Sequence, residues 1–223
     1  THRKCSRTFA TMLNLMDQYP DFRFICGQAV QYEWIRDEFP ELYTRIKQRV
    51  KEGRWEPFGA MYVEPDCNVP SAESLIRQLL YGIRFFEKEM GVRCRTVWLP
   101  DAFGYNYGMP QILKKCGIET FVTTKISWSH YTEFPYDYFQ WEGADGSRIR
   151  GLMPTRNYNQ RPYPEHILRQ RDKFKQKEKV AELPYCFGAG DGGGGPTADE
   201  VERVLRLGNI AGMPRMKFGS HQA

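Results

Sequence analysis

The sequence predicts an α/β fold in which helices cover a largely parallel sheet. Short runs of β-branched and aromatic residues alternate repeatedly with amphipathic stretches along the 223 residues. Such alternation is typical of βαβ units, and a long series of units favours a barrel or a doubly wound sheet. A chain of this length can bury one substantial core, so we expect one domain, or most of one.

Helices are predicted where apolar residues recur at spacings of three and four. Ser71 can cap a long helix that Gly91 closes, and Thr197 forms a capping box with Glu200 ahead of another helix. The predicted helices are an opening segment that ends near Pro20, then residues 29–38, 41–52, 72–90, 110–116, 164–179 and the segment that follows Thr197.

Strands are predicted where β-branched and aromatic residues cluster between turn signals. These segments are residues 22–26, 55–63, 96–99, 120–124, 138–141, 148–152, 185–187 and 216–218. Asp145-Gly146 predicts a hairpin between the fifth and sixth of them. Helical segments separate most of the others, which favours parallel pairing.

Bulk composition narrows the class of protein. The chain has 41% hydrophobic and 26% charged residues and a formal charge of +5, spread over helical stretches such as Arg169 to Lys179. We therefore expect no nucleic-acid partner. No run of about 18 apolar residues and no signal peptide is visible, so we expect no membrane partner.

The cysteines indicate a reducing compartment. Six are present, at positions 5, 26, 67, 94, 116 and 186, and none forms a C-x-x-C pair. We expect reduced, mostly buried thiols and a cytoplasmic location. The chain opens directly into a helical pattern and stops soon after a strand-like run, so we also expect a piece of a larger protein.

Three loops stand out because each brings an acid directly after a predicted strand. They cover residues 64–68, 100–107 and 188–195. In a barrel or a doubly wound sheet, function gathers at the carboxyl ends of the strands. These loops are therefore the candidate site.

Asp101 is the first candidate. It follows the strand Thr96 to Leu99, is preceded by Pro100 and is surrounded by aromatic residues. An oriented, partly desolvated carboxylate suits a nucleophile or a metal ligand. The alternative is an aspartate that begins a turn by accepting hydrogen bonds from its own backbone.

Asp191 lies in the loop of residues 188–195, and four consecutive glycines follow it. Glycine offers no packing, so such a loop indicates a close approach of backbone to a ligand. The Gly-Lys-Ser/Thr ending of a phosphate loop is missing, which argues against a nucleotide. Asp191 could act as a general acid/base, and the alternative is a flexible linker with an incidental acid.

Glu64 and Asp66 lie in the loop of residues 64–68 and could hold sugar hydroxyls. Apolar faces for a pyranose ring could come from Trp128, Trp141 and Tyr62. For each aromatic residue the alternative is a place in the core. Two carboxylates on rigid strand ends around one pocket are the minimum equipment for glycoside hydrolysis. The residues themselves thus lead to a carboxylate-lined hydrolase-like site without naming its substrate.

Ordered motifs along nearly the whole chain resemble one family, the class II α-mannosidases of glycoside hydrolase family 38, and in particular their cytosolic and bacterial subgroup. The motifs are Arg54-Trp55-Glu56-Pro57, Val63-Glu64-Pro65-Asp66-Cys67-Asn68, Trp98-Leu99-Pro100-Asp101, Phe103-Gly104-Tyr105, Pro110-Gln111-Ile112-Leu113-Lys114-Lys115, Lys125-Ile126-Ser127-Trp128, Trp141-Glu142-Gly143, Asp145-Gly146-Ser147-Arg148 and Gly190-Asp191-Gly192-Gly193-Gly194-Gly195-Pro196-Thr197.

This resemblance implies a seven-stranded α/β barrel, of which residues 1–223 are the central part without the first strand. It implies a retaining enzyme that removes terminal α-linked mannose from oligosaccharides, with Asp101 as both nucleophile and zinc ligand. Asp191 would be the acid/base, and Glu64, Asp66 and Trp128 would bind the substrate.

The zinc site implied by the family is not complete in this sequence. The other ligands come from a His-x-Asp motif and a downstream histidine, and neither motif is present. His2, His130, His166 and His221 do not match those positions and are not assigned to metal. We expect the remaining ligands outside this chain, and we expect the chain alone to hold zinc poorly and to be inactive.

Two alternatives remain open at this stage. The chain could be a non-catalytic fragment or sugar-binding remnant, or, more distantly, a metal-dependent deacetylase on a related barrel. A barrel that lacks its first strand would expose strand edges, which makes a homo-oligomer possible.

Overall fold

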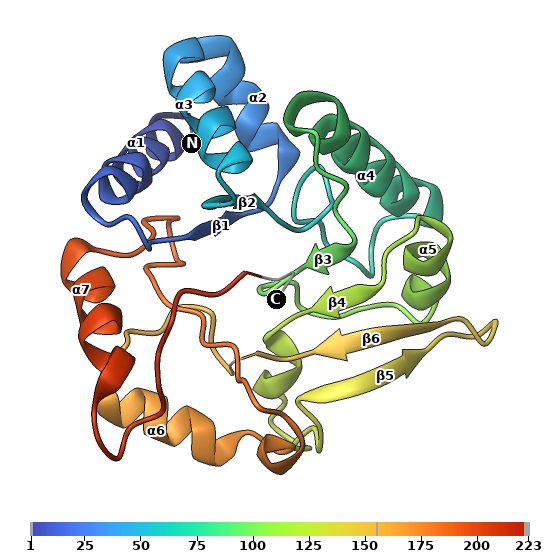
Figure 1. Cartoon of the computed structure of the whole chain (residues 1–223). Coiled ribbons are helices and arrows are strands. Elements are labelled where there is room, and N and C mark those ends of the chain that lie inside the picture. Colours follow the sequence, from blue (N-terminus) through green and yellow to red (C-terminus); the bar gives the residue numbers. More distant parts are fainter. Residues whose placement is uncertain (1, 155, 221–223) are drawn as a thin grey trace. The chain divides into compact units, whose positions relative to one another are not determined.

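The computed structural model describes residues 2–154 and 156–220, which form two compact units. The first is built from the described parts of 1–25, 31–56 and 157–223, and the second from those of 26–30 and 57–156. Figure 1 shows the elements of both. Within the described residues no helix is long and apolar enough to cross a membrane.

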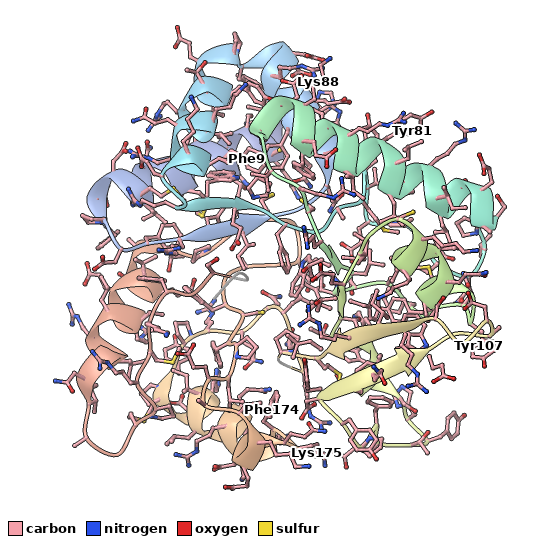
Figure 2. All side chains as sticks on the ribbon, turned by 45° about the vertical axis from the view of Figure 1, so that its right-hand side comes forward. Phe9, Tyr81, Lys88, Tyr107, Phe174 and Lys175 are labelled. Carbon is pink, nitrogen blue, oxygen red and sulfur yellow. The ribbon has the colours of Figure 1, made fainter. Side chains whose placement is uncertain are left out.

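The first unit is mainly helical. Its core brings together Phe9, Tyr32 and Trp55, with the Trp55 indole N–H donating to the Tyr32 hydroxyl at 2.9 Å and the Phe9 ring edge-on to the indole. Figure 2 labels Phe9 on its helix. The helices of this unit are α1 (His2–Gln18), most of α2 (Ala29–Glu38), α3 (Pro40–Lys51), α6 (Pro164–Lys173) and α7 (Ala198–Arg206).

The second unit contains a four-stranded sheet in the order β3-β4-β6-β5. Its strands are β3 (Thr96–Trp98), β4 (Thr120–Val122), β5 (Tyr138–Glu142) and β6 (Arg148–Leu152). β3, β4 and β6 are parallel, and β5 joins β6 as the predicted antiparallel hairpin. Gly146 has the left-handed φ of 79° that this turn requires.

Helices α4 (Ala72–Phe85) and α5 (Met109–Lys115) lie along one face of this sheet (Figure 1). The predicted caps are confirmed. The Ser71 hydroxyl accepts from the Ser74 N–H, and Gly91 ends the π-helical turn Phe86–Met90 with a left-handed φ of 68°. Because α5 connects the parallel strands β3 and β4, the loops that follow these two strands both leave the carboxyl edge of the sheet.

The predicted strand over residues 55–63 is wrong in its length. A two-stranded sheet pairs β1 (Phe24–Cys26) with β2 (Trp55–Pro57), and β2 stops there. Gly59 and Ala60 have φ values of 119° and 56°, which no extended strand can hold. The chain instead bends toward the Glu64 loop.

The strands predicted over 185–187 and 216–218 are also wrong. Phe187 makes a single bridge to Gln160, and residues 216–218 join no ladder. Their aromatic character serves packing, since the Phe218 ring lies against Phe22 and Phe187. Hydrophobicity alone does not distinguish a buried loop from a strand.

The helix predicted over 164–179 is shorter than expected. It ends at Lys173 because Phe174 turns to extended backbone, with a ψ of 120°, and buries its ring. Figure 2 labels Phe174 at this break. A short 3₁₀ turn, Lys177–Lys179, follows it.

We predict that Gly82→Ala destabilises the fold of the second unit. A Cβ at Gly82 would lie 2.1 Å from the Ala60 carbonyl oxygen and 2.7 Å from the Tyr62 nitrogen, both backbone atoms. Overpacking should lower the free energy of unfolding by about 1–3 kcal/mol, against a gain in helix propensity of at most about 1 kcal/mol. Denaturant unfolding measures the difference.

Gly219→Ala is the matched control. Gly219 is exposed, and a Cβ at this position would have no neighbour within 4 Å. Its effect should stay within about 0.5 kcal/mol. Equal free energies of unfolding for both variants would contradict the close packing of α4 on residues 60–62.

Candidate active site

Asp101 follows β3 at the carboxyl edge of the sheet, as predicted. Its side chain is 41% exposed, and its Oδ1 accepts from the Lys125 Nζ at 2.7 Å. Lys125 follows β4, the neighbouring parallel strand, and its side chain is only 6% exposed. A carboxylate that is partly exposed and held by a buried cation is oriented for chemistry, which the turn alternative does not explain.

Two aromatic rings flank the Lys125 ammonium. Its Nζ lies 3.2 Å from the centroid of the Trp128 ring and 4.6 Å from that of Phe103. Both rings are otherwise exposed. A cation over the face of an indole is attracted by the ring quadrupole, so the rings stabilise the ammonium in its largely dry position.

Glu64 lies beside Asp101. Its Oε1 accepts the Asp101 backbone N–H at 2.9 Å, which ties the two candidate loops together. Burial raises the pKa of the Glu64 carboxyl; the Asp101 N–H lowers it, while the charge of the Asp101 carboxylate raises it further. Glu64 therefore positions the backbone of the nucleophile candidate and also presents a carboxyl group near it.

Asp66 engages its own loop. Its Oδ1 accepts from the backbone N–H groups of Val69 at 2.7 Å and Asn68 at 2.8 Å, and these hydrogen bonds lower the pKa of its carboxyl. This is a turn-forming role. A contact between Asp66 and substrate stays a prediction.

Behind the Asp101 loop the packing is dense. The Tyr105 hydroxyl donates to the Leu99 carbonyl at 2.9 Å and also bonds Thr123. Trp141, one of the predicted sugar platforms, packs its ring on Phe121 and Tyr105. Burial raises the pKa of the nearby Cys67 thiol to about 12, so it is neutral near pH 7.

Asp191 lies in the first unit, in the glycine-rich loop. Its Oδ1 accepts from the Tyr158 hydroxyl at 3.0 Å and its Oδ2 lies 3.4 Å from the Asn159 amide nitrogen. Asn159 also accepts the Gly190 N–H at 2.8 Å. The loop is thus hydrogen-bonded to residues 158 and 159 and is not a free linker, while the acid/base role of Asp191 stays a prediction.

The glycines of this loop are needed for its shape. Gly192, Gly193 and Gly195 have left-handed φ values between 63° and 81°. A Cβ at Gly195 would meet the Met12 sulfur at 2.9 Å. The Gly193 carbonyl accepts from the Thr8 hydroxyl of α1 at 2.6 Å.

A polar hollow of about 180 Å³ lies beside the same loop, within the first unit. Glu200, which completes the predicted capping box, lies 3.9 Å from the Arg161 guanidinium, and Arg203 covers the Tyr163 ring. The hollow is lined by Asn159, Arg161, Tyr163, Gly188, Ala189, Thr197, Asp199, Glu200 and Arg203.

Metal ligands are sparse in this part of the protein. Among the described residues no group of three or more histidine, cysteine, aspartate or glutamate side chains is arranged to hold a metal. His2 instead stacks on Trp34, and His166 contacts the Arg161 carbonyl. His221 lies outside the described residues. Asp101 and Glu64 alone do not fit the four-ligand requirement of a zinc site.

The role of Lys125 was missed in the sequence. The candidate loops were identified by acids that follow predicted strands. Lys125 also follows a predicted strand directly, the one over 120–124, and shares the same sheet edge. That position was the available signal. Tyr158 and Asn159, which hold Asp191, had no comparable signal because no predicted strand ends directly before them.

The site holds an oriented, partly exposed aspartate at a parallel strand end, with a second carboxyl group beside it. The family model described as "Glycosyl hydrolases family 38 N-terminal domain" matches residues 1–223. The chain belongs to this family.

Named relatives agree. The chain is 43% identical over 221 residues to alpha-mannosidase G of Dictyostelium discoideum and 42% identical to alpha-mannosidase 2C1 of Homo sapiens, in each case over 99% of its length. Alpha-mannosidase of Saccharomyces cerevisiae is 35% identical over 98% of the chain. The chain spans about a fifth of the length of these curated relatives.

Solved structures support the fold. An alpha-mannosidase from Enterococcus faecalis V583 superposes with a TM-score of 0.72 at 21% identity, covering 92% of this chain and 24% of that one. A 4-alpha-glucanotransferase from Thermococcus litoralis gives 0.65 at 15% identity, covering 85% of this chain and 30% of that one. The predicted α/β class is confirmed, whereas the described strands form two separate sheets of two and four strands.

We predict that Asp66→Ala lowers the melting temperature by a few degrees at pH 7, because two backbone N–H groups lose their acceptor. The pKa of Asp66 is lowered in the folded state, so its charge-dependent stabilisation is present above the unfolded pKa of about 3.9. That stabilisation is lost as pH falls through the lower folded value. Thermal unfolding from pH 3 to pH 8 measures it.

Asp66→Asn is the control for this prediction, since it keeps one acceptor oxygen and should lose less. A difference between wild type and Asp66→Ala that stays constant across the whole pH range would contradict the turn-forming role of the carboxylate.

Proposed function

We propose that this chain is the central part of the catalytic barrel domain of a retaining α-mannosidase that removes terminal α-linked mannose from oligosaccharides. Membership of glycosyl hydrolase family 38 and the names of the relatives support the reaction class. The observation that carries the proposal is the Asp101 carboxylate, partly exposed and oriented at the end of β3. In the proposal the complete domain closes into a seven-stranded barrel.

In this mechanism Asp101 is the nucleophile. One carboxylate oxygen attacks the anomeric carbon of mannose while the bond to the leaving oxygen breaks, which yields a mannosyl ester on Asp101. Asp191 donates the proton that the leaving oxygen takes up. It then removes a proton from the water that hydrolyses the ester, so both carboxyl groups return to their starting states.

Of the three residues predicted to bind substrate, two keep that role in the proposal. Glu64 is best supported, because its carboxyl lies against the Asp101 backbone and is largely shielded from solvent. Asp66 shapes the loop that carries Glu64. Trp128, the third, presents an exposed ring near Asp101, but one of its faces carries the Lys125 ammonium, so its contact with substrate stays a prediction.

Zinc enters the proposal only through the complete protein. The described residues do not form a zinc site by themselves. Asp101 would be one ligand, and the others would come from sequence beyond this chain. Metal analysis of the complete protein measures this directly.

We predict that Asp101→Asn lowers kcat for an aryl α-mannoside at least about a thousandfold, because an amide cannot form the glycosyl ester. The assay uses the complete protein that carries this chain. Asp145→Asn is a matched control, since Asp145 lies in the β5–β6 turn and should leave turnover unchanged. Full activity of Asp101→Asn would refute the nucleophile assignment, and an inactive wild type would favour a non-catalytic or sugar-binding role.

We predict that Asp191→Asn slows turnover in a way that depends on the leaving group. A general acid contributes about 10²–10⁴-fold when the leaving oxygen needs a proton. A dinitrophenyl mannoside needs little protonation and should be spared, whereas a methyl or sugar leaving group should not. Equal slowing for every leaving group would argue against the acid role of Asp191.

A further inference from the structure

Lys125 has an unusual environment for a lysine near the surface. Its side chain is 6% exposed, yet the Asp101 carboxylate it pairs with is 41% exposed. Its Nζ lies closer to the Trp128 ring centroid, at 3.2 Å, than to that of Phe103 at 4.6 Å. The ammonium is thus enclosed by one carboxylate oxygen and two ring faces, while the carboxylate remains accessible.

The backbone builds this arrangement. The buried Thr124 hydroxyl donates to the Pro100 carbonyl at 2.8 Å, which ties the end of β4 to the residue before Asp101. The segment Lys125–Trp128 then forms a 3₁₀ turn. Side chains at i and i+3 are eclipsed in such a turn, so Lys125 and Trp128 project to the same side.

The turn is itself held in place. The Ser127 hydroxyl lies 2.7 Å from the Thr124 carbonyl and 3.2 Å from the Arg156 carbonyl, both within hydrogen-bond distance. The Thr123 hydroxyl accepts the Lys125 N–H at 3.3 Å. The lysine and tryptophan are therefore placed together by local structure and need no bound ligand to meet.

We propose that Lys125 is a positioning residue for Asp101 and that Trp128 acts on the reaction through Lys125. The kinetic consequence of this inference rests on the proposed function, whereas the ion pair is observed in the structure independently of that function. The lysine holds Oδ1, which leaves the second carboxylate oxygen to form the bond to the anomeric carbon. The face of Trp128 that covers the ammonium is closed to a pyranose ring.

The two possible roles of Trp128 differ in what its loss would change. A sugar platform contributes to binding in the ground state, so its removal raises KM. A residue that holds Lys125 on Asp101 affects the reacting carboxylate, so its removal lowers kcat and leaves KM near its original value. Its effect should also depend on the presence of Lys125, because the tryptophan ring contacts the ammonium that pairs with Asp101.

The kinetic test is a double-mutant cycle in the complete protein with an aryl α-mannoside as substrate. We expect Lys125→Met to lower kcat about 100-fold and Trp128→Leu about tenfold, each with KM changed by less than about threefold. The double variant should be no slower than Lys125→Met alone. Lys125→Arg should recover part of kcat because it restores a cation.

Control variants come from the same unit. Lys114→Met removes an exposed lysine of α5, and Tyr131→Leu removes an almost fully exposed ring; both should leave kcat and KM unchanged. A rise in KM without a fall in kcat for Trp128→Leu would overturn the proposal in favour of a sugar platform. A double variant whose loss of kcat equals the product of the two single losses would also overturn it.

A second measurement does not depend on activity. In the wild-type background Lys125→Met removes the ion pair with Asp101, whereas in Asp101→Asn that ion pair is already lost. Lys125→Met should therefore lower the melting temperature more in the wild-type background than in Asp101→Asn. Equal shifts in both backgrounds would refute the ion pair. If the Lys125→Met shift differs between the two backgrounds but the protein does not hydrolyse the mannoside, the ion pair is upheld and the proposed function is refuted.

Discussion

The ion pair between Asp101 and Lys125 organises the second unit around one sheet edge. Its members follow β3 and β4, which are adjacent and parallel. Parallel strands end at the same edge, so residues 24 positions apart in the sequence meet without any long-range loop. The Thr124 contact to Pro100 and the Glu64 contact to the Asp101 N–H then fix both loops at that edge. Loss of the parallel register would separate the pair.

Charge and burial divide the roles of the three ionisable residues at this edge. Lys125 is nearly enclosed, and a buried cation is tolerated only when it is paired. Asp101 supplies that pairing while keeping part of its carboxylate in solvent. Glu64 is buried beside a second acid, which raises the pKa of its carboxyl. A buried carboxyl group beside a partly exposed one suits a different task for each.

Much of the fold could be predicted because periodicity, caps and turns are local signals. The Ser71 cap, the Asp145-Gly146 turn and the Thr197 capping box all appear as expected. Two of the failures share one cause. Phe218 packs against the ring of Phe22 and Phe174 is buried in the core, and a sequence window cannot separate such packing from strand or helix formation.

The candidate site was only partly predictable for a related reason. The position of Asp101 after a strand is visible in the sequence, but its partner is set by which strand lies next to β3, a fact of sheet topology. The loop of Asp191 differs in kind, since left-handed glycines and the Tyr158 and Asn159 side chains hold an exposed acid there. In the proposed mechanism a carboxylate held by an enclosed cation suits a nucleophile, whose direction of attack must not vary. The exposed acid suits proton transfer, which must exchange with water in every cycle.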